Sequence, residues 1–162
     1  MTLRQAVPDD FGFIRSLTSD PANAPFIGHD DEAQLTAYLA DPRVRVMIWQ
    51  GETPMGFAIF REIGHASGRV ELFRLALAQT GTGRGRTFMA ALIDFAFQDL
   101  SAARLWLDCS GENPRARRLY ERAGFRQEGC LRSHWHRPAL GRAVDMVFYG
   151  MMRDEVPALP LA

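Results

Sequence analysis

The sequence contains no lysine, because every basic residue apart from histidine is an arginine. A lysine Schiff base and a lysine nucleophile are therefore excluded, and so is the phosphate loop that depends on lysine. Cysteine is also scarce. Cys109 and Cys130 are too few for a disulfide framework and lack metal-ligand spacing, so they favour a reducing compartment.

An excess of charge is lacking too. Nineteen arginines balance nineteen acidic residues, giving a formal net charge of zero. No global basic field would attract nucleic acid or a membrane surface, and neither partner is expected. No signal peptide or long apolar span is recognisable, so a cytoplasmic location is the expectation.

The length and apolar content predict one well-buried core. A chain of 162 residues with 47% hydrophobic residues can bury one such core and is short for two. We therefore expect a single domain spanning residues 1–162.

Hydrophobic periodicity predicts an α/β fold. Helices are expected at 8–18, 31–40, 87–97 and 113–123, and a shaped surface loop at 19–29. The order strand, helix, strand across 70–109 implies a parallel crossover, whereas the other strands follow one another as hairpins. Strands with alternating or β-rich patterns are expected at 2–7, 44–49, 55–60, 70–77, 104–109, 125–134 and 143–152.

The stretch Ala-Gln-Thr-Gly-Thr-Gly-Arg-Gly-Arg at 78–86 ends the fourth strand and opens a helix. Gly81, Gly83 and Gly85 have no Cβ atoms, so backbone N–H groups can converge on an oxyanion. The N-terminus of the helix adds its partial positive charge. The dinucleotide fingerprint does not fit, because its third glycine position falls on Arg86 or Phe88. The stretch predicts a pyrophosphate cradle, with a plain glycine-rich turn as the alternative.

A second stretch, 111–125, marks the boundaries of its own helix. Asn113 is placed to cap the N-terminus, Pro114 occupies the first helical position, and Gly124 provides the C-terminal stop. Tyr120 lies seven residues after Asn113, which puts the two side chains on the same helix face.

Together the two stretches resemble the GNAT superfamily of N-acetyltransferases. The first resembles its acetyl-CoA loop, Arg/Gln-x-x-Gly-x-Gly/Ala, except that Thr80 stands at the opening position. The resemblance covers roughly residue 70 to the end, and the central Val-Glu-Leu-x-Arg-Leu is similar to the branch containing ribosomal-protein N-terminal acetyltransferases. The second stretch matches Asn-x-x-Ala-x-x-Leu-Tyr-x-x-x-Gly-Phe at Asn113, Ala116, Leu119, Tyr120, Gly124 and Phe125.

The resemblance implies a GNAT fold, a mixed and mostly antiparallel seven-stranded sheet with about four flanking helices. Its central strands would part to admit acetyl-CoA, with Tyr120 as general acid toward the CoA thiolate. Asp108 occupies the position of an acidic residue proposed to deprotonate the amine, with Glu71 or water as rivals. No metal is expected. The implied cofactor-binding residues are Leu75, Ala76 and Leu77, Gly81, Thr82, Gly83, Arg84, Gly85 and Arg86, and Asn113.

The implied reaction is direct acetylation of a primary amine, on a small molecule or a protein N-terminus. An acyl-CoA-binding sensor or regulatory module without turnover is the alternative. Acceptor pockets in similar enzymes are built by the first loop and the last hairpin, so Phe26, His29, Trp135 and His136 suggest an aromatic, weakly polar site. The expected partners are acetyl-CoA and an amine acceptor, and a homodimer is left open.

Overall fold

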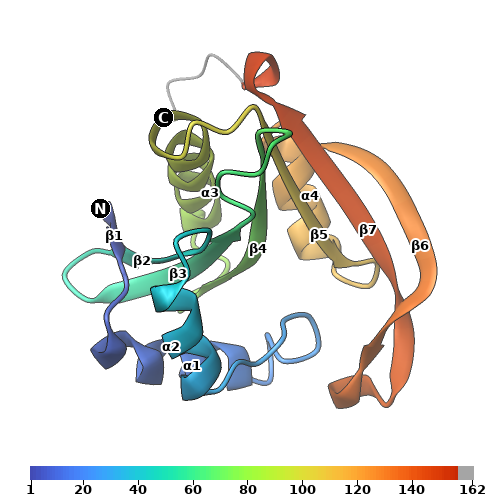
Figure 1. Ribbon diagram of the computed structural model, residues 1–162. Coiled ribbons are helices and arrows are strands. Elements are labelled where there is room, and N and C mark those ends of the chain that lie inside the picture. Colours follow the sequence, from blue (N-terminus) through green and yellow to red (C-terminus); the bar gives the residue numbers. More distant parts are fainter. Residues whose placement is uncertain (157–162) are drawn as a thin grey trace.

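All strands of the described chain join in one sheet. The computed structural model describes residues 1–156. The strand order is β1-β2-β3-β4-β5-β7-β6, and every neighbouring pair is antiparallel except β4 and β5 (Figure 1). The strands are β1 (Thr2–Gln5), β2 (Arg45–Gln50), β3 (Pro54–Arg61), β4 (Arg69–Leu77), β5 (Arg104–Ser110), β6 (Arg126–Arg137) and β7 (Arg142–Met152).

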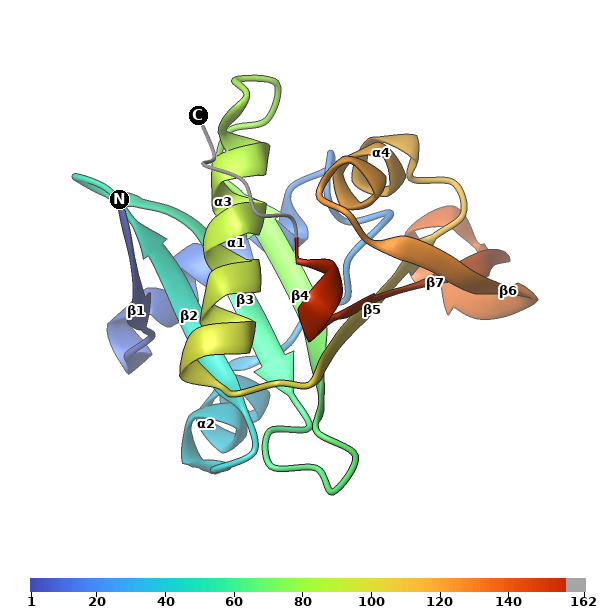
Figure 2. The same ribbon diagram turned by 90° about the horizontal axis from the view of Figure 1, so that it is seen from above.

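Helices cover the two faces of the sheet in separate places (Figure 2). One core contains Leu17 of α1 and Leu35 of α2, packed against the side chains of β2 and β3. The other contains Phe88 of α3 and Tyr120 of α4, packed against β4, β5 and β7. The α-helices are α1 (Phe11–Ser19), α2 (Glu32–Ala40), α3 (Arg84–Asp94) and α4 (Pro114–Arg122). These elements confirm the expected mixed sheet with four flanking helices.

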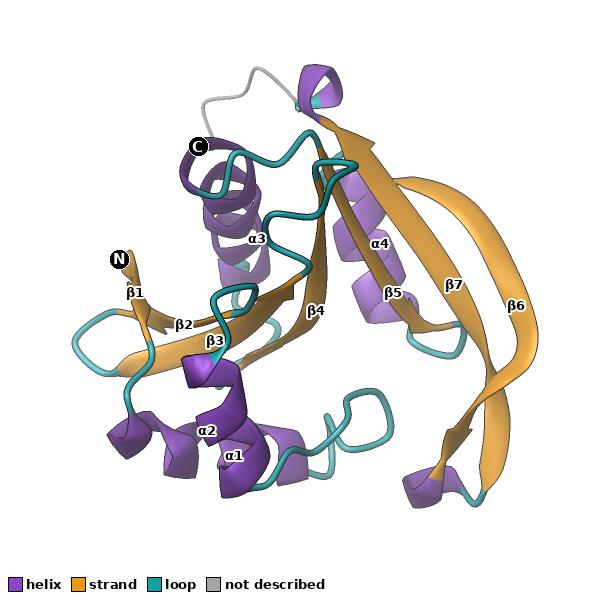
Figure 3. Ribbon diagram, viewed as in Figure 1, coloured by secondary structure: helices purple, strands orange, loops and turns teal. Residues whose placement is uncertain are grey.

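The parallel pair β4 and β5 is joined over only three positions. Arg69, Val70 and Glu71 lie opposite Arg104, Leu105 and Trp106. Beyond that point β4 continues alongside β3 to Leu77 and β5 continues alongside β7 to Ser110, so the two strands diverge within the sheet (Figure 3). Over these residues each strand has an edge with no strand partner, which leaves backbone N–H and C=O groups free to bind something else.

Local signals in the sequence account for the helix ends around this gap. Asn113 Oδ1 accepts a hydrogen bond from the Ala116 N–H at 3.1 Å, Pro114 follows it, and Gly124 has a φ of 101° after the last turn. The predicted cap, first residue and stop of α4 are therefore confirmed.

The helix α3 differs from the prediction at both ends. It begins at Arg84, three residues earlier than expected, because Gly83 adopts a φ of 78° and ends the loop there. At its other end the helix continues as a π-helical segment, η2 (Phe95–Asp99), in which the Leu100 N–H bonds the Phe95 carbonyl. The last three residues of the predicted phosphate loop, Arg84, Gly85 and Arg86, thus form the first helical turn.

Among residues 1–156, no helix is long and apolar enough to cross a membrane. The expected cytoplasmic location stays a prediction.

Candidate active site

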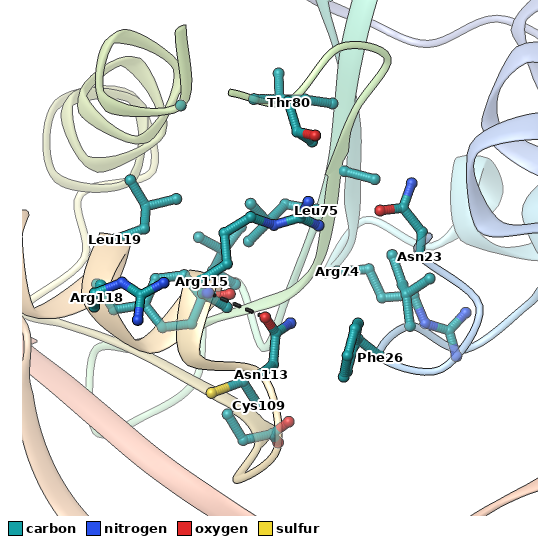
Figure 4. Close-up of a pocket in the computed structure, with 18 of the residues that line it drawn as sticks. Asn23, Phe26, Arg74, Leu75, Thr80, Cys109, Asn113, Arg115, Arg118 and Leu119 are labelled. Atoms are coloured by element: carbon teal, nitrogen blue, oxygen red, sulfur yellow. Dashed lines mark hydrogen bonds between the residues drawn. The ribbon is translucent and has the colours of Figure 1, made fainter. Parts of the chain in front are cut away.

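A cavity of about 570 Å³ occupies the gap between β4 and β5. Its lining comes from elements that cover opposite faces of the sheet. The glycine loop and α4 contribute one part, and the loop joining α1 to α2 contributes the other (Figure 4). Trp135 of β6 also lines the cavity. Because both groups line one continuous space, the cavity passes through the sheet.

Most of the predicted cofactor residues line this cavity. Asn113 is buried, and its side chain both caps α4 and faces the cavity. Two predicted residues lie elsewhere: Thr82 is exposed at the loop tip, and Arg84 donates a hydrogen bond to Gln79 Oε1 at 3.3 Å. The predicted residues that do line it are Leu75, Ala76, Leu77, Gly81, Gly83, Gly85, Arg86 and Asn113, together with the unusual Thr80.

The glycine loop offers an open approach to its backbone. Gly81 and Gly83 have φ values of 82° and 78°, which disfavour residues with a side chain. A Cβ atom built at either position would meet nothing within 4 Å. The loop therefore exposes its backbone at the N-terminus of α3, as an oxyanion cradle requires.

Three arginines of α4 also line the cavity: Arg115, Arg118 and Arg122. Arg117, by contrast, points away and donates to the Tyr149 hydroxyl at 3.1 Å. With Arg86, this side of the cavity carries four cations, a charge suited to the phosphates of CoA.

Tyr120 lies on the buried side of α4. Its ring makes edge contacts with Tyr149 and Phe125, at centroid separations of 5.7 and 6.1 Å. Burial, followed by the nearby Cys109 and Asp108, raises the pKa of the Tyr120 phenol. The ring thus packs in the core while the residue still lines the cavity, and its phenol stays protonated at neutral pH.

Two carboxylates compete for the position of a base. Asp108 of β5 lines the cavity, and burial raises its pKa, while Arg61 and His134 oppose that rise. Glu71 of β4 also lines the cavity and its pKa is also raised by burial, but it forms an ion pair with Arg61 at 2.7 Å. No hydrogen bond to the Asp108 carboxylate is found within residues 1–156, whereas the Glu71 carboxylate accepts one from Arg61 Nε at 2.8 Å.

Cys109 lies beside both candidates and is buried. Burial first, and the neighbouring Asp108 second, raise the pKa of its thiol to about 12. A thiol with that pKa is almost entirely protonated at neutral pH and is a poor nucleophile. Among residues 1–156, no cluster of histidine, cysteine or carboxylate side chains could hold a metal ion.

The first loop and the last hairpin meet at the far end of the cavity. Phe26 and Trp135 line it as predicted, whereas His29 and His136 are exposed, and His29 is hydrogen-bonded to the Thr18 hydroxyl at 2.7 Å. Arg137 joins the two segments through hydrogen bonds to backbone carbonyls of the first loop. Sequence reasoning missed Arg137, because nothing local marks a contact across more than a hundred residues.

The two central strands diverge, a glycine loop lies at one end of the gap, and a protonated phenol lies near two carboxylates. This arrangement is typical of enzymes that transfer an acyl group from a CoA thioester. The comparisons agree. The profile described as Acetyltransferase (GNAT) family matches residues 11–125. The chain belongs to the GNAT family of acetyltransferases, and its activity is the acetyl-CoA-dependent N-acetylation of an amine.

The names of individual relatives indicate different acceptors. The chain is 27% identical to a spermidine N(1)-acetyltransferase of Vibrio cholerae over 142 residues, covering 81% of this chain and 82% of that protein. It is 33% identical to a kanamycin resistance protein of Rhizobium radiobacter over 84 residues, covering 51% of this chain and 68% of that protein.

A solved structure shows the same fold. Spermidine N-acetyltransferase from Vibrio cholerae, in complex with CoA and spermine, superimposes with a TM-score of 0.83 at 23% identity, covering 95% of this chain and 96% of that one. None of these relatives is named as a ribosomal-protein acetyltransferase, so that branch has no support from them.

Proposed function

We propose that the whole chain, residues 1–162, is one catalytic domain that transfers acetyl directly from acetyl-CoA to a primary amine, on a small molecule or a protein N-terminus. Tyr120 is the general acid and Asp108 the general base. The observation that carries this proposal is their position: both residues line the cavity that also exposes the glycine loop. Acid, base and cofactor cradle therefore face one space where a thioester and an amine could meet.

The cavity residues can accept and donate the protons that acetyl transfer requires. The ammonium of the acceptor first gives one proton to Asp108, which releases it to solvent. The amine nitrogen then attacks the thioester carbonyl, and its remaining excess proton leaves by the same route. The C–S bond then breaks, and the departing sulfur takes a hydrogen bond or a proton from the Tyr120 hydroxyl. The protonated thiol of Cys109 supports direct transfer over an acetyl-enzyme intermediate.

The cofactor is expected to lie against both edges of the gap. The unpaired edge of β4 at Leu75, Ala76 and Leu77 would bond the pantetheine arm as an added strand does, and Asn113 would contact it from the opposite side. Gly81, Gly83 and Gly85 with Arg86 would hold the pyrophosphate. Thr82 and Arg84 are proposed only for its outer contacts, because neither lines the cavity.

The test is release of free CoA thiol when the protein and acetyl-CoA meet amino acids, aromatic amines, polyamines, aminoglycosides and N-terminal peptides. Release with at least one amine, and formation of the acetylated amine by mass spectrometry, is the expected result. Tight acetyl-CoA binding with no release for any amine would instead indicate a sensor. The Glu71→Gln and Asp108→Asn variants then separate the two candidate bases.

A further inference from the structure

The acceptor end of the cavity holds little free charge. Four charged residues line it: Arg61, Glu71, Arg74 and Asp108. Arg61 is paired with Glu71 at 2.7 Å, and Arg74 is in contact with the carboxylate of Asp30. Asp108 is the carboxylate left over, so this end of the cavity offers one negative charge to a ligand.

The two arginines are also fixed in place by an aromatic ring. The guanidinium carbons of Arg61 and Arg74 lie 3.4 and 4.4 Å from the ring centroid of Phe73. Each cation therefore has both a carboxylate and a ring face as partners, and neither arginine can turn away without losing both. A second ammonium group arriving here would meet two fixed guanidinium groups.

Apart from Asn23, whose Nδ2 donates a hydrogen bond to the Leu17 carbonyl at 3.0 Å, the other residues at the acceptor end are apolar. Phe26 and Ile27 come from the loop between α1 and α2, Met146 from β7 and Trp135 from β6. One face of the Trp135 ring is covered by the guanidinium of Arg137, whose carbon lies 3.8 Å from the ring centroid. Because Arg137 is itself bonded to the first loop, the indole is held as a fixed flat wall.

We propose that the acceptor is a primary monoamine whose single ammonium pairs with Asp108 and whose remainder is a flat apolar group lying against Phe26 and Trp135. This inference rests on the proposed function and narrows it. The reason is a charge count. A polyamine or an aminoglycoside brings several ammonium groups, and each additional one would lose water without gaining a carboxylate. A flat apolar group gains by leaving water.

The first experiment compares kcat/KM for 2-phenylethylamine, spermidine and kanamycin, from CoA release. We expect 2-phenylethylamine to exceed both by about tenfold or more, the effect of burying one aromatic side chain. A higher kcat/KM for spermidine or kanamycin would overturn the inference while leaving the proposed N-acetylation intact.

A second measurement does not depend on turnover. Calorimetry on the CoA-saturated protein gives the affinity of each amine. Tighter binding of 2-phenylethylamine than of spermidine is expected even if no amine releases CoA, an outcome that would reject only the proposed function. Tighter binding of spermidine overturns the inference.

A variant pair tests the charge count directly. Met146 pairs with Ser110, and Asp108 pairs with Phe148, so Met146 and Asp108 share a sheet face as diagonal neighbours. Such residues lie about 7–8 Å apart. Met146→Glu therefore adds a second carboxylate near the first, and Met146→Gln adds the same length without charge. We expect kcat/KM for spermidine to be about tenfold higher in the Glu variant than in the Gln variant, as a charged hydrogen bond allows. Equal values would overturn the inference.

Discussion

Arg137 donates a hydrogen bond from Nε to the backbone carbonyl of Pro25, 112 residues earlier in the chain, at 3.0 Å. Its Nη2 donates to the carbonyls of Ala24 and Ile27 at 2.5 and 2.7 Å. Burial lowers the pKa of Arg137, yet three carbonyl oxygens compensate for the lost water. One side chain thus ties the last hairpin to the loop that forms the acceptor end of the cavity.

Replacing Arg137 should separate those two walls. We expect Arg137→Gln to lower kcat/KM for the acceptor by about ten- to a hundredfold, since small displacements near a reacting centre have effects of that size. Acetyl-CoA affinity should not change, because the glycine loop and α4 are not touched. Initial rates with each substrate varied in turn measure both effects.

Arg153 provides a matched control for this variant. It donates three hydrogen bonds to the backbone carbonyls of Phe97 and Ala102, and it does not line the cavity. Arg153→Gln should reduce thermal stability as Arg137→Gln does, but leave the acceptor KM unchanged. A similar rise of KM in both variants would mean that general loss of stability, and not the link to the first loop, is responsible.

Tyr120→Phe should bind acetyl-CoA normally and lose turnover by about two orders of magnitude, the lower end of the range for general acids. The lower end is expected because burial raises the pKa of Tyr120 above the ordinary value of about 10, while a thiol lies near about 8.5. Complete proton transfer to the thiolate is then unfavourable, and the hydroxyl acts mainly as a hydrogen-bond donor. Single-turnover rates measure the loss.

Tyr149→Phe is the control for Tyr120→Phe. The Tyr149 hydroxyl donates to Glu121 at 2.9 Å and accepts from Arg117, so its removal should cost stability by about 0.5–1.5 kcal/mol. Its turnover should stay near that of the wild type. If Tyr120→Phe turns over at the wild-type rate, Tyr120 fills core space and has no part in proton transfer.

Gly83 and Gly64 allow backbone strain to be separated from cofactor binding. Their φ values are 78° and 77°, and a Cβ atom at either would meet nothing within 4 Å. Alanine should therefore cost about 1–2 kcal/mol at each, the penalty of the left-handed conformation. Only Gly83→Ala should also weaken acetyl-CoA binding, measured by calorimetry. Equal acetyl-CoA affinities in the two variants would remove the glycine loop from the proposed site.

Asp108→Asn should make the protein inactive and more stable at neutral pH. Burial raises the pKa of Asp108 in the folded state, so between the unfolded and folded pKa values the folded state holds the proton more often. Stability therefore falls as pH rises through that window and stays lower above it. Below both pKa values the carboxyl is protonated in either state and costs nothing.

The measurement is the difference in melting temperature between Asp108→Asn and the wild type, from pH 4 to pH 8. A difference that grows with pH is expected, and a constant one would contradict the assigned pKa shift. The activity of the wild type should rise over the same window as Asp108 loses its proton. If Asp108→Asn stays active and Glu71→Gln does not, Glu71 is the base.

Much of this fold follows from local signals in the sequence. Gly83 and Gly124 mark positions with a positive φ, which favours a residue without Cβ. Asn113 and Pro114 specify the start of α4. Alternating or β-rich patterns locate all seven strands within a few residues. The early start of α3 was missed because Gly85 weakens the helical pattern there. The π-helical turn after Asp94 was missed because a single turn with hydrogen bonds between residues i and i+5 produces no repeating pattern in the sequence.

The site was predicted less completely, for a different reason. The irregularity in β4 at Phe73, the Arg61–Glu71 pair and the Arg137 contacts all depend on which strands become neighbours. The order of strands along the chain does not state their register or the sheet face that each residue occupies. Roles in the site that involve one residue could be proposed from motifs, whereas those that depend on pairs needed the structure.

The cavity between β4 and β5 is lined by α4 and the glycine loop on one side and by the loop after α1 on the other, so we expect each substrate to have its own entrance. Phosphates would enter beside α3 and α4, and the amine beside the loop after α1. Neither molecule stands in the path of the other, so we expect either to arrive first and either product to leave first. Reciprocal plots of initial rate should then intersect, and free CoA should compete with acetyl-CoA without competing with the amine. The rate of such an enzyme would depend separately on the acetyl-CoA/CoA ratio and on the acceptor concentration. It would fall when CoA accumulates, even at a high concentration of acceptor.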